Sequence, residues 1–228
     1  MKRMAFTMIE LVLVIVVLGI LAALAIPRLE SDHRQDAADN LLSAIRYTQH
    51  LALMDNKNDR TGSGLKAPIR TNWQRALWHM RFSSYDGGAK WFYTISSSQD
   101  ADANVDQNEV AVDPSNGKIM YNLAGDDEIG PNESPNIFIS ELYGINAVDF
   151  TNCTGATGRT RNSNTARHIA FDYAGRPHKG IYGASNNYAT VMHQDCIIHF
   201  TFLNNSTPID ININQETGYA FIVGQIDS

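Results

Sequence analysis

The chain has 228 residues, of which 43% are hydrophobic and 18% charged, and its formal net charge is −6. This length suits one globular domain with an additional apolar segment and argues against a multi-domain enzyme. The acidic balance argues against a general affinity for nucleic acids, although a local basic patch could still bind them.

The first element is a long apolar stretch that contains one acidic residue, Glu10, and follows the basic pair Lys2 and Arg3. As a helix, residues 6–27 would extend roughly 33 Å, about the thickness of one bilayer core. One interpretation is a membrane anchor, and another is a signal peptide that is cleaved after Ala25 and releases a secreted soluble β-domain. Neither explains Glu10, because an unpaired carboxylate near hydrocarbon costs about 2–3 kcal/mol.

The residues around Glu10 resemble the class III leader of type IV pilin-like proteins, which include the pseudopilins of type II secretion. A short basic leader ends at the small residue Ala5, where the family usually has glycine, and Phe6-Thr7-Met8-Ile9-Glu10 follows. The resemblance implies cleavage by prepilin peptidase between Ala5 and Phe6, N-methylation of Phe6, and a helix kink at Pro27.

Glu10 lies four residues, or one helical turn, from the α-amino group that cleavage would create on Phe6. When apolar helices bundle into a filament core, a neighbour's amino group would neutralise Glu10, and each charge would offset the other's desolvation. Glu10 is therefore predicted to set the register between subunits during assembly.

Beyond Pro27 the apolar residues recur with a period near 3.6, which predicts that residues 28–56 form an amphipathic helix packed on a globular domain. One helix is expected from about Phe6 to Met54, bent near Pro27. Its expected buried positions are Ala37, Ala38, Leu41, Leu42, Ala44, Ile45, Leu51 and Ala52.

Within residues 57–228 the period changes to two, first around Trp78 and then around Tyr93, which is typical of strands. The predicted fold is α+β, with a long N-terminal helix, transmembrane in its first half and amphipathic in its second, packed on a mostly antiparallel β-sheet domain. Further strands are expected near residues 118–122, 137–139, 147–150, 168–173, 197–203, 209–213 and 220–223.

An acidic segment spaces its oxygen ligands like the start of a calcium loop, at Asp100, Asp102, Asn104 and Asp106. It lacks the glycine and the final acidic residue that such a loop needs. A solvated acidic loop is the ordinary interpretation, calcium is the alternative, and no other cofactor is expected.

The two cysteines, Cys153 and Cys196, lie outside any CxxC spacing. If the N-terminus directs the domain out of the cytoplasm, an oxidising compartment favours a disulfide between them. Two unpaired buried thiols are the alternative.

Arg159, Arg161 and Arg167 form the one notable basic patch. Gly158-Arg159-Thr160-Arg161 resembles the Gly-Arg-x-Arg element with which some FimT-like pilins bind DNA during uptake, although in that family the element lies nearer the C-terminus. Arginines here would contact phosphates in a salt-sensitive manner. The alternative is an ordinary exposed loop.

Residues 169–177 resemble the Phe-x-x-x-Gly-Arg-Pro turn of minor pilins and pseudopilins of the GspH/FimT type, with Phe171 at its start. Gly175 permits a positive φ and Pro177 fixes its own φ, which suits a tight connection between strands.

No GxSxG, P-loop, GxGxxG or HExxH motif is present, so no enzymatic activity is predicted. The resemblance implies a minor pseudopilin or minor pilin with residues 1–5 as leader peptide. It would be a single-pass protein of the bacterial inner membrane with a periplasmic domain, and filament-associated after assembly. The expected partners are other pilins, prepilin peptidase and the inner-membrane assembly platform. A DNA-binding minor pilin of a competence pilus is the principal alternative.

Overall fold

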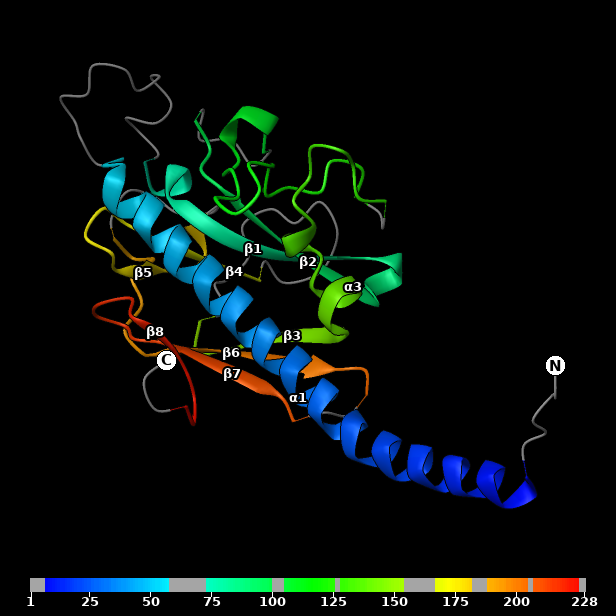
Figure 1. Cartoon of the computed structure of the whole chain (residues 1–228). Helices are drawn as coiled ribbons and strands as arrows, with labels where there is room; N and C mark the ends of the chain where they lie inside the picture. Colours follow the sequence, from blue (N-terminus) through cyan, green and yellow to red (C-terminus); the bar gives the residue numbers. More distant parts are fainter. Residues whose placement is uncertain are drawn as a thin grey trace.

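The computed structural model describes residues 7–57, 73–99, 105–125, 128–153, 167–181, 188–204 and 207–225, with the side chains of residues 22–32 excepted. The fold is α+β: a 47-residue helix, α1 (Met8–Met54), lies against two four-stranded antiparallel sheets (Figure 1).

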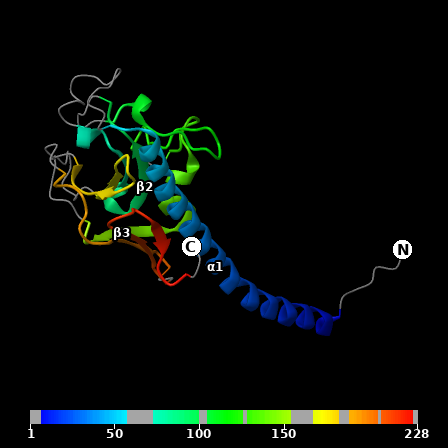
Figure 2. The ribbon, with the colours of Figure 1, turned by 90° about the vertical axis from the view of Figure 1, so that its left-hand side faces the viewer.

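The start of α1 is closed by Thr7, whose hydroxyl accepts a hydrogen bond from the Glu10 N–H, while the Glu10 carboxylate accepts one from the Thr7 N–H. This reciprocal capping box satisfies two of the backbone donors that a helix N-terminus leaves unpaired. The helix ends at Met54, and its C-cap residue, Asp55, takes an extended conformation. Figure 2 shows the N-terminal part of α1 standing clear of the globular domain, while its C-terminal part crosses that domain.

Each sheet has its own strand order. The first sheet runs β2-β1-β4-β5 and the second runs β3-β6-β7-β8, with every neighbouring pair antiparallel. The strands of the first sheet are β1 (Trp78–Tyr85), β2 (Lys90–Ser96), β4 (Arg167–Phe171) and β5 (Pro177–His178). Those of the second are β3 (Ile145–Thr151), β6 (Cys196–Phe202), β7 (Ile209–Ile213) and β8 (Ala220–Ile222).

The remaining helical elements are short. They are α3 (Ile139–Tyr143) and the 3-10 turns η1 (Trp73–Ala76), η2 (Asp86–Gly88), η3 (Gln107–Glu109) and η4 (Pro135–Ile137). The helix α3 contacts α1 and the strands β2 and β3, so it lies where the two sheets meet.

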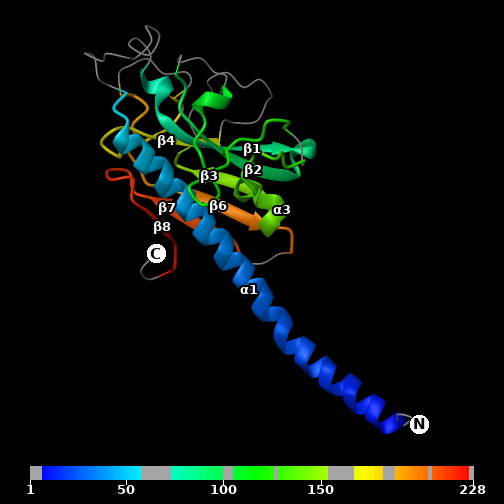
Figure 3. The same ribbon diagram turned by 45° about the horizontal axis from the view of Figure 1, so that its top comes forward.

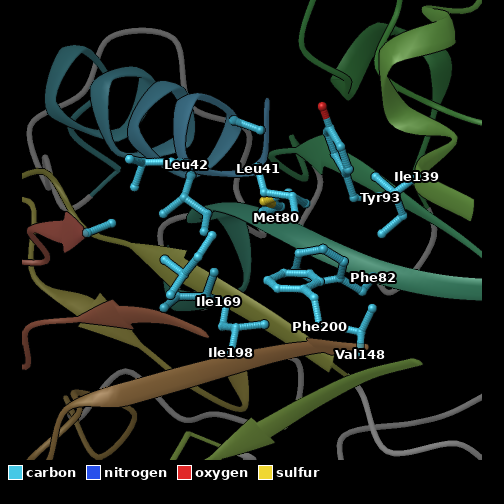
Figure 4. Close-up of a cluster of buried hydrophobic side chains, with 14 of the residues drawn as sticks. Leu41, Leu42, Met80, Phe82, Tyr93, Ile139, Val148, Ile169, Ile198 and Phe200 are labelled. Carbon is cyan, nitrogen blue, oxygen red and sulfur yellow. The ribbon is translucent and has the colours of Figure 1, made fainter. Parts of the chain in front are cut away.

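The C-terminal part of α1 closes one core that both sheets share, because it contacts β1 and β4 of the first sheet and β7 and β8 of the second. Figure 3 shows α1 passing across both sheets. Leu41 and Leu42 point from α1 toward Met80 and Ile169 of the first sheet and Ile198 of the second (Figure 4). Each such side chain contributes roughly 2 kcal/mol by burial.

The 3.6-residue pattern correctly predicted this buried face of α1. Seven of its eight positions are buried, and the eighth, Leu51, is partly buried against the same core.

The membrane assignments require correction. Among the described residues, no helix has both the length and the apolar character needed to cross a membrane. The finding contradicts the transmembrane segment predicted at residues 6–27 and the single-pass inner-membrane location predicted with it.

The β-rich part also differs from expectation in detail. The strands fall into two sheets, and two predicted strands are wrong. At residues 118–122, Ile119 forms only isolated bridges, to Val112 and Glu133. Residues 137–139 belong to η4 and the start of α3, because a short apolar run does not distinguish a strand from a buried helical turn.

Candidate functional site

The N-terminal part of α1 is the most unusual surface in the described chain. Every residue from Met8 to Leu21 is exposed, and the large apolar side chains among them are between 46% and 87% exposed. Because consecutive positions are apolar, the exposed surface runs all round the helix and is not confined to one stripe. A helix of this kind is normally buried on all sides. We call residues 8–21 the apolar segment.

Glu10 is the one charged residue of the apolar segment. Its carboxylate accepts hydrogen bonds from the backbone N–H and the hydroxyl of Thr7, both at 2.9 Å. The carboxylate therefore has partners within its own chain before any neighbour arrives. The pattern Thr-x-x-Glu is a sequence signature of a capping box, which sequence analysis overlooked.

Of the other residues predicted to act in processing or to bend the helix, the structure describes only the backbone of Pro27. Ala5 and Phe6 lie outside the described residues, so the cleavage and methylation site stays a prediction. Pro27 lies within α1, whose helical backbone continues through it, but its side chain is among those not described.

The apolar segment is followed by a point of attachment to the globular domain. The Arg34 guanidinium donates to the carbonyls of Thr207 (2.9 Å) and Pro208 (3.3 Å), which precede β7. Beside it, the Gln225 amide donates to Gln35 at 2.7 Å. From here to its C-terminus, α1 is part of the folded domain.

A second attachment joins α1 to the turn that resembles the GspH/FimT motif. The Gln49 side-chain amide donates to the carbonyls of Gly175 (2.9 Å) and Thr217 (2.8 Å). The backbone of Gly218 packs so closely beneath Gln49 that a Cβ there would collide with the Gly175 carbonyl and lie 2.6 Å from the Gln49 amide nitrogen. Gln49 thus holds together two turns that are far apart in sequence, and sequence analysis gave no sign of it.

Asp172 organises the interior of the first of these turns. It accepts hydrogen bonds from the backbone N–H groups of Ala174 and Arg176 and from the Arg176 guanidinium, at 2.7–3.0 Å. Burial raises the pKa of Asp172, but the hydrogen bonds from His178 and Arg176 outweigh it and hold that pKa below its ordinary value. The arginine of this motif therefore stabilises the turn.

The predicted disulfide is confirmed. Cys153 and Cys196 are bonded, with their Cα atoms 5.0 Å apart and a sequence separation of 43. Cys153 follows β3 and Cys196 begins β6, which are adjacent antiparallel strands, so the bond closes one end of this pair.

Three of the four residues proposed for calcium, Asp100, Asp102 and Asn104, lie outside the described residues. The fourth, Asp106, caps η3 in a capping box with Glu109. Within the described ranges, no cluster of three or more His, Cys, Asp or Glu side chains is arranged to hold a metal ion.

Of the three arginines proposed to contact DNA, only Arg167 is among the described residues. Arg159 and Arg161 lie outside the described residues. Arg167 pairs with Asp149 at 3.2 Å and stacks over the Trp91 ring at 4.6 Å, so its guanidinium is committed to contacts within the domain.

Comparison with protein-family models, curated proteins and solved structures finds no match to this chain.

Proposed function

We propose that the chain is a structural subunit of a type IV pilin-like filament, as a minor pseudopilin or minor pilin, and that it assembles through the apolar segment of α1. The observation that carries this proposal is the exposure of apolar side chains on every side of that helix. Contiguous exposed apolar surface of this kind marks an interaction site.

The all-round distribution indicates the type of partner. A groove on another protein would cover one face of a helix and leave the other in water. A bundle of equivalent helices from other subunits covers every face and gains about 25 cal/mol for each Å² of apolar surface removed from water. We therefore infer that other pilin-like subunits surround the apolar segment.

Glu10 would give such a bundle its register. The two hydrogen bonds from Thr7 satisfy part of the carboxylate but leave its charge uncompensated. If prepilin peptidase cleaves before Phe6, the new amino group of a neighbouring subunit supplies the missing positive charge. Since a buried charge without a partner is strongly destabilising, subunits would assemble with these two groups together.

The test compares filament incorporation of Glu10→Val with that of the wild-type chain. We expect incorporation to fall by at least about tenfold, because the amino group of the neighbour then lacks its partner. Asp39→Asn is the matched control, since it removes an exposed charge from the packed part of the same helix. Normal incorporation of Glu10→Val would overturn the register role.

Mass spectrometry of the N-terminus tests the processing step. An N-methylated Phe6 supports the proposal. A chain that begins at Ile26 has lost the apolar segment to signal-peptide cleavage, and filament assembly through that segment would then be ruled out.

A further inference from the structure

A chain of four buried polar side chains runs from η1 to the turn between β4 and β5. The Gln74 amide nitrogen lies 2.7 Å from the Thr190 hydroxyl, which lies 2.8 Å from Nδ1 of His178. Nε2 of His178 lies 3.3 Å from the Asp172 carboxylate. Gln74, His178 and Asp172 are fully buried, and Thr190 is 7% exposed.

The direction of each hydrogen bond follows from the two side chains at the ends of this series, Asp172 and Gln74. The ionised Asp172 only accepts, so Nε2 of His178 carries a hydrogen, and in the tautomer with its single hydrogen on Nε2 the Nδ1 atom is an acceptor. The Gln74 amide only donates through its nitrogen. The Thr190 hydroxyl therefore accepts from Gln74 and donates its own hydrogen to His178.

This arrangement is that of an activated nucleophile: a hydroxyl, a histidine base, and a carboxylate that orients the base. The Asp172 carboxylate is itself held by Arg176 and by two backbone N–H groups, so the base has a fixed position. The group next to the Thr190 hydroxyl, and so the one that it could attack, is the side-chain amide of Gln74.

We propose that Thr190 and Gln74 react within the folded domain to form an ester cross-link. The Thr190 oxygen attacks the side-chain carbonyl carbon of Gln74 while His178 takes the hydroxyl proton. The carbon–nitrogen bond of the amide then breaks, and His178 returns the proton to the departing nitrogen. The products are one ester bond and one molecule of ammonia, and no other reactant is required.

The geometry places the reacting atoms near one another. The carbonyl carbon of Gln74 is one bond, about 1.3 Å, from the nitrogen that contacts Thr190, so it lies within about 4 Å of the hydroxyl oxygen. The amide must turn so that its face, and not its N–H, meets the hydroxyl, and this rotation brings the carbon to the attack distance of about 3–3.5 Å. Burial excludes the water that would otherwise hydrolyse the ester.

The bond would add a second covalent tie to the domain. The disulfide joins two strands of the second sheet, whereas the ester would join η1, at the entrance to β1, to the segment that pairs with β5. This inference does not depend on the proposed function, because it concerns chemistry internal to the globular domain.

The experiment is mass spectrometry of the full wild-type chain, denatured and reduced after purification. Formation of the ester lowers the intact mass by about 17 Da, the mass of ammonia. Trypsin separates residues 71–75 from residues 180–228, which carry Gln74 and Thr190 respectively. We expect these two peptides to appear as one linked species, and their recovery as separate peptides of full mass would overturn the proposal.

Variants assign the mass loss to this site. Thr190→Val and Gln74→Met remove one reacting group each with little change in shape, and both are expected to restore the full mass and yield separate peptides. Thr190→Ser keeps the hydroxyl and is expected to keep the link. Thr48→Val, which changes another buried threonine, is the matched control and is expected to keep it as well.

His178→Gln tests the base and should leave the peptides unlinked. If the mass loss persists in Thr190→Val, it arises elsewhere in the chain, and the ester is excluded. The digest of the wild-type chain is decisive even if a variant fails to fold.

Discussion

The two ends of α1 both carry large apolar side chains but have opposite relations to the rest of the chain. From Met8 to Leu21 the apolar side chains are exposed, whereas Ala37, Leu41 and Ile45 are fully buried against the two sheets. The apolar surface of the first region stabilises the protein only when another molecule covers it. That of the second region stabilises the domain as soon as the domain folds. Helicity and hydrophobicity alone therefore do not indicate which part of a helix stabilises a fold.

Truncating one leucine in each region should give the largest contrast. Leu41→Ala leaves a cavity in the shared core and is expected to lower the free energy of unfolding by about 3 kcal/mol. Leu13→Ala, at a side chain that is 63% exposed, should change it by less than about 0.5 kcal/mol. Denaturant unfolding of the full chain, kept monomeric in mild detergent, measures both, and equal effects would break the comparison.

Between pH 7 and pH 5, acid should act on the packed region and leave residues 11–21 of the apolar segment unaffected. Burial of His79 lowers its pKa to about 4, partly opposed by its hydrogen bond to the Leu77 carbonyl and reinforced by Arg81. The folded state therefore resists protonation, and stability that is complete above about pH 6.5 is lost as the pH falls toward 4.

From pH 7 to pH 5 this effect amounts to about 2 kcal/mol. His79→Gln should remove most of the loss, as measured by urea unfolding at both pH values. An unchanged pH dependence in the variant would show that another group is responsible. Between Leu11 and Leu21 there is no titratable side chain, so the helicity of that stretch should not respond.

The smallest expected effect concerns the attachment of α1 through Gln49. Gly218→Ala and Gly117→Ala both place a Cβ at a positive φ, 69° and 74° respectively, but only at Gly218 does the Cβ meet other atoms. Both should cost about 1 kcal/mol in backbone strain. Gly218→Ala should cost at least about 1 kcal/mol more, because it forces the two turns and Gln49 apart.

Thermal unfolding of the two glycine variants side by side isolates that difference. Equal destabilisation would mean that the packed region of α1 does not depend on this close approach.

Sequence patterns predicted the features that depend on local period. The 3.6-residue spacing identified the buried face of α1, and alternation located β7 at its observed bounds, Ile209–Ile213. Both succeed because a residue's face on a regular element follows from its position alone. The same reasoning placed a strand at residues 137–139, where the chain forms helical turns, because the run is too short to reveal its period.

Sequence alone therefore determined which residues of this protein are apolar at which spacing, and that the two cysteines are suited to a disulfide. Only the tertiary structure decided that Gln49 joins the turns at Gly175 and Thr217, and that Gln74 meets Thr190. These contacts unite residues more than 100 positions apart, and their partners are selected by how the two sheets pack beneath α1. Local pattern indicates that a polar group is near the core, but only packing selects the group that it meets.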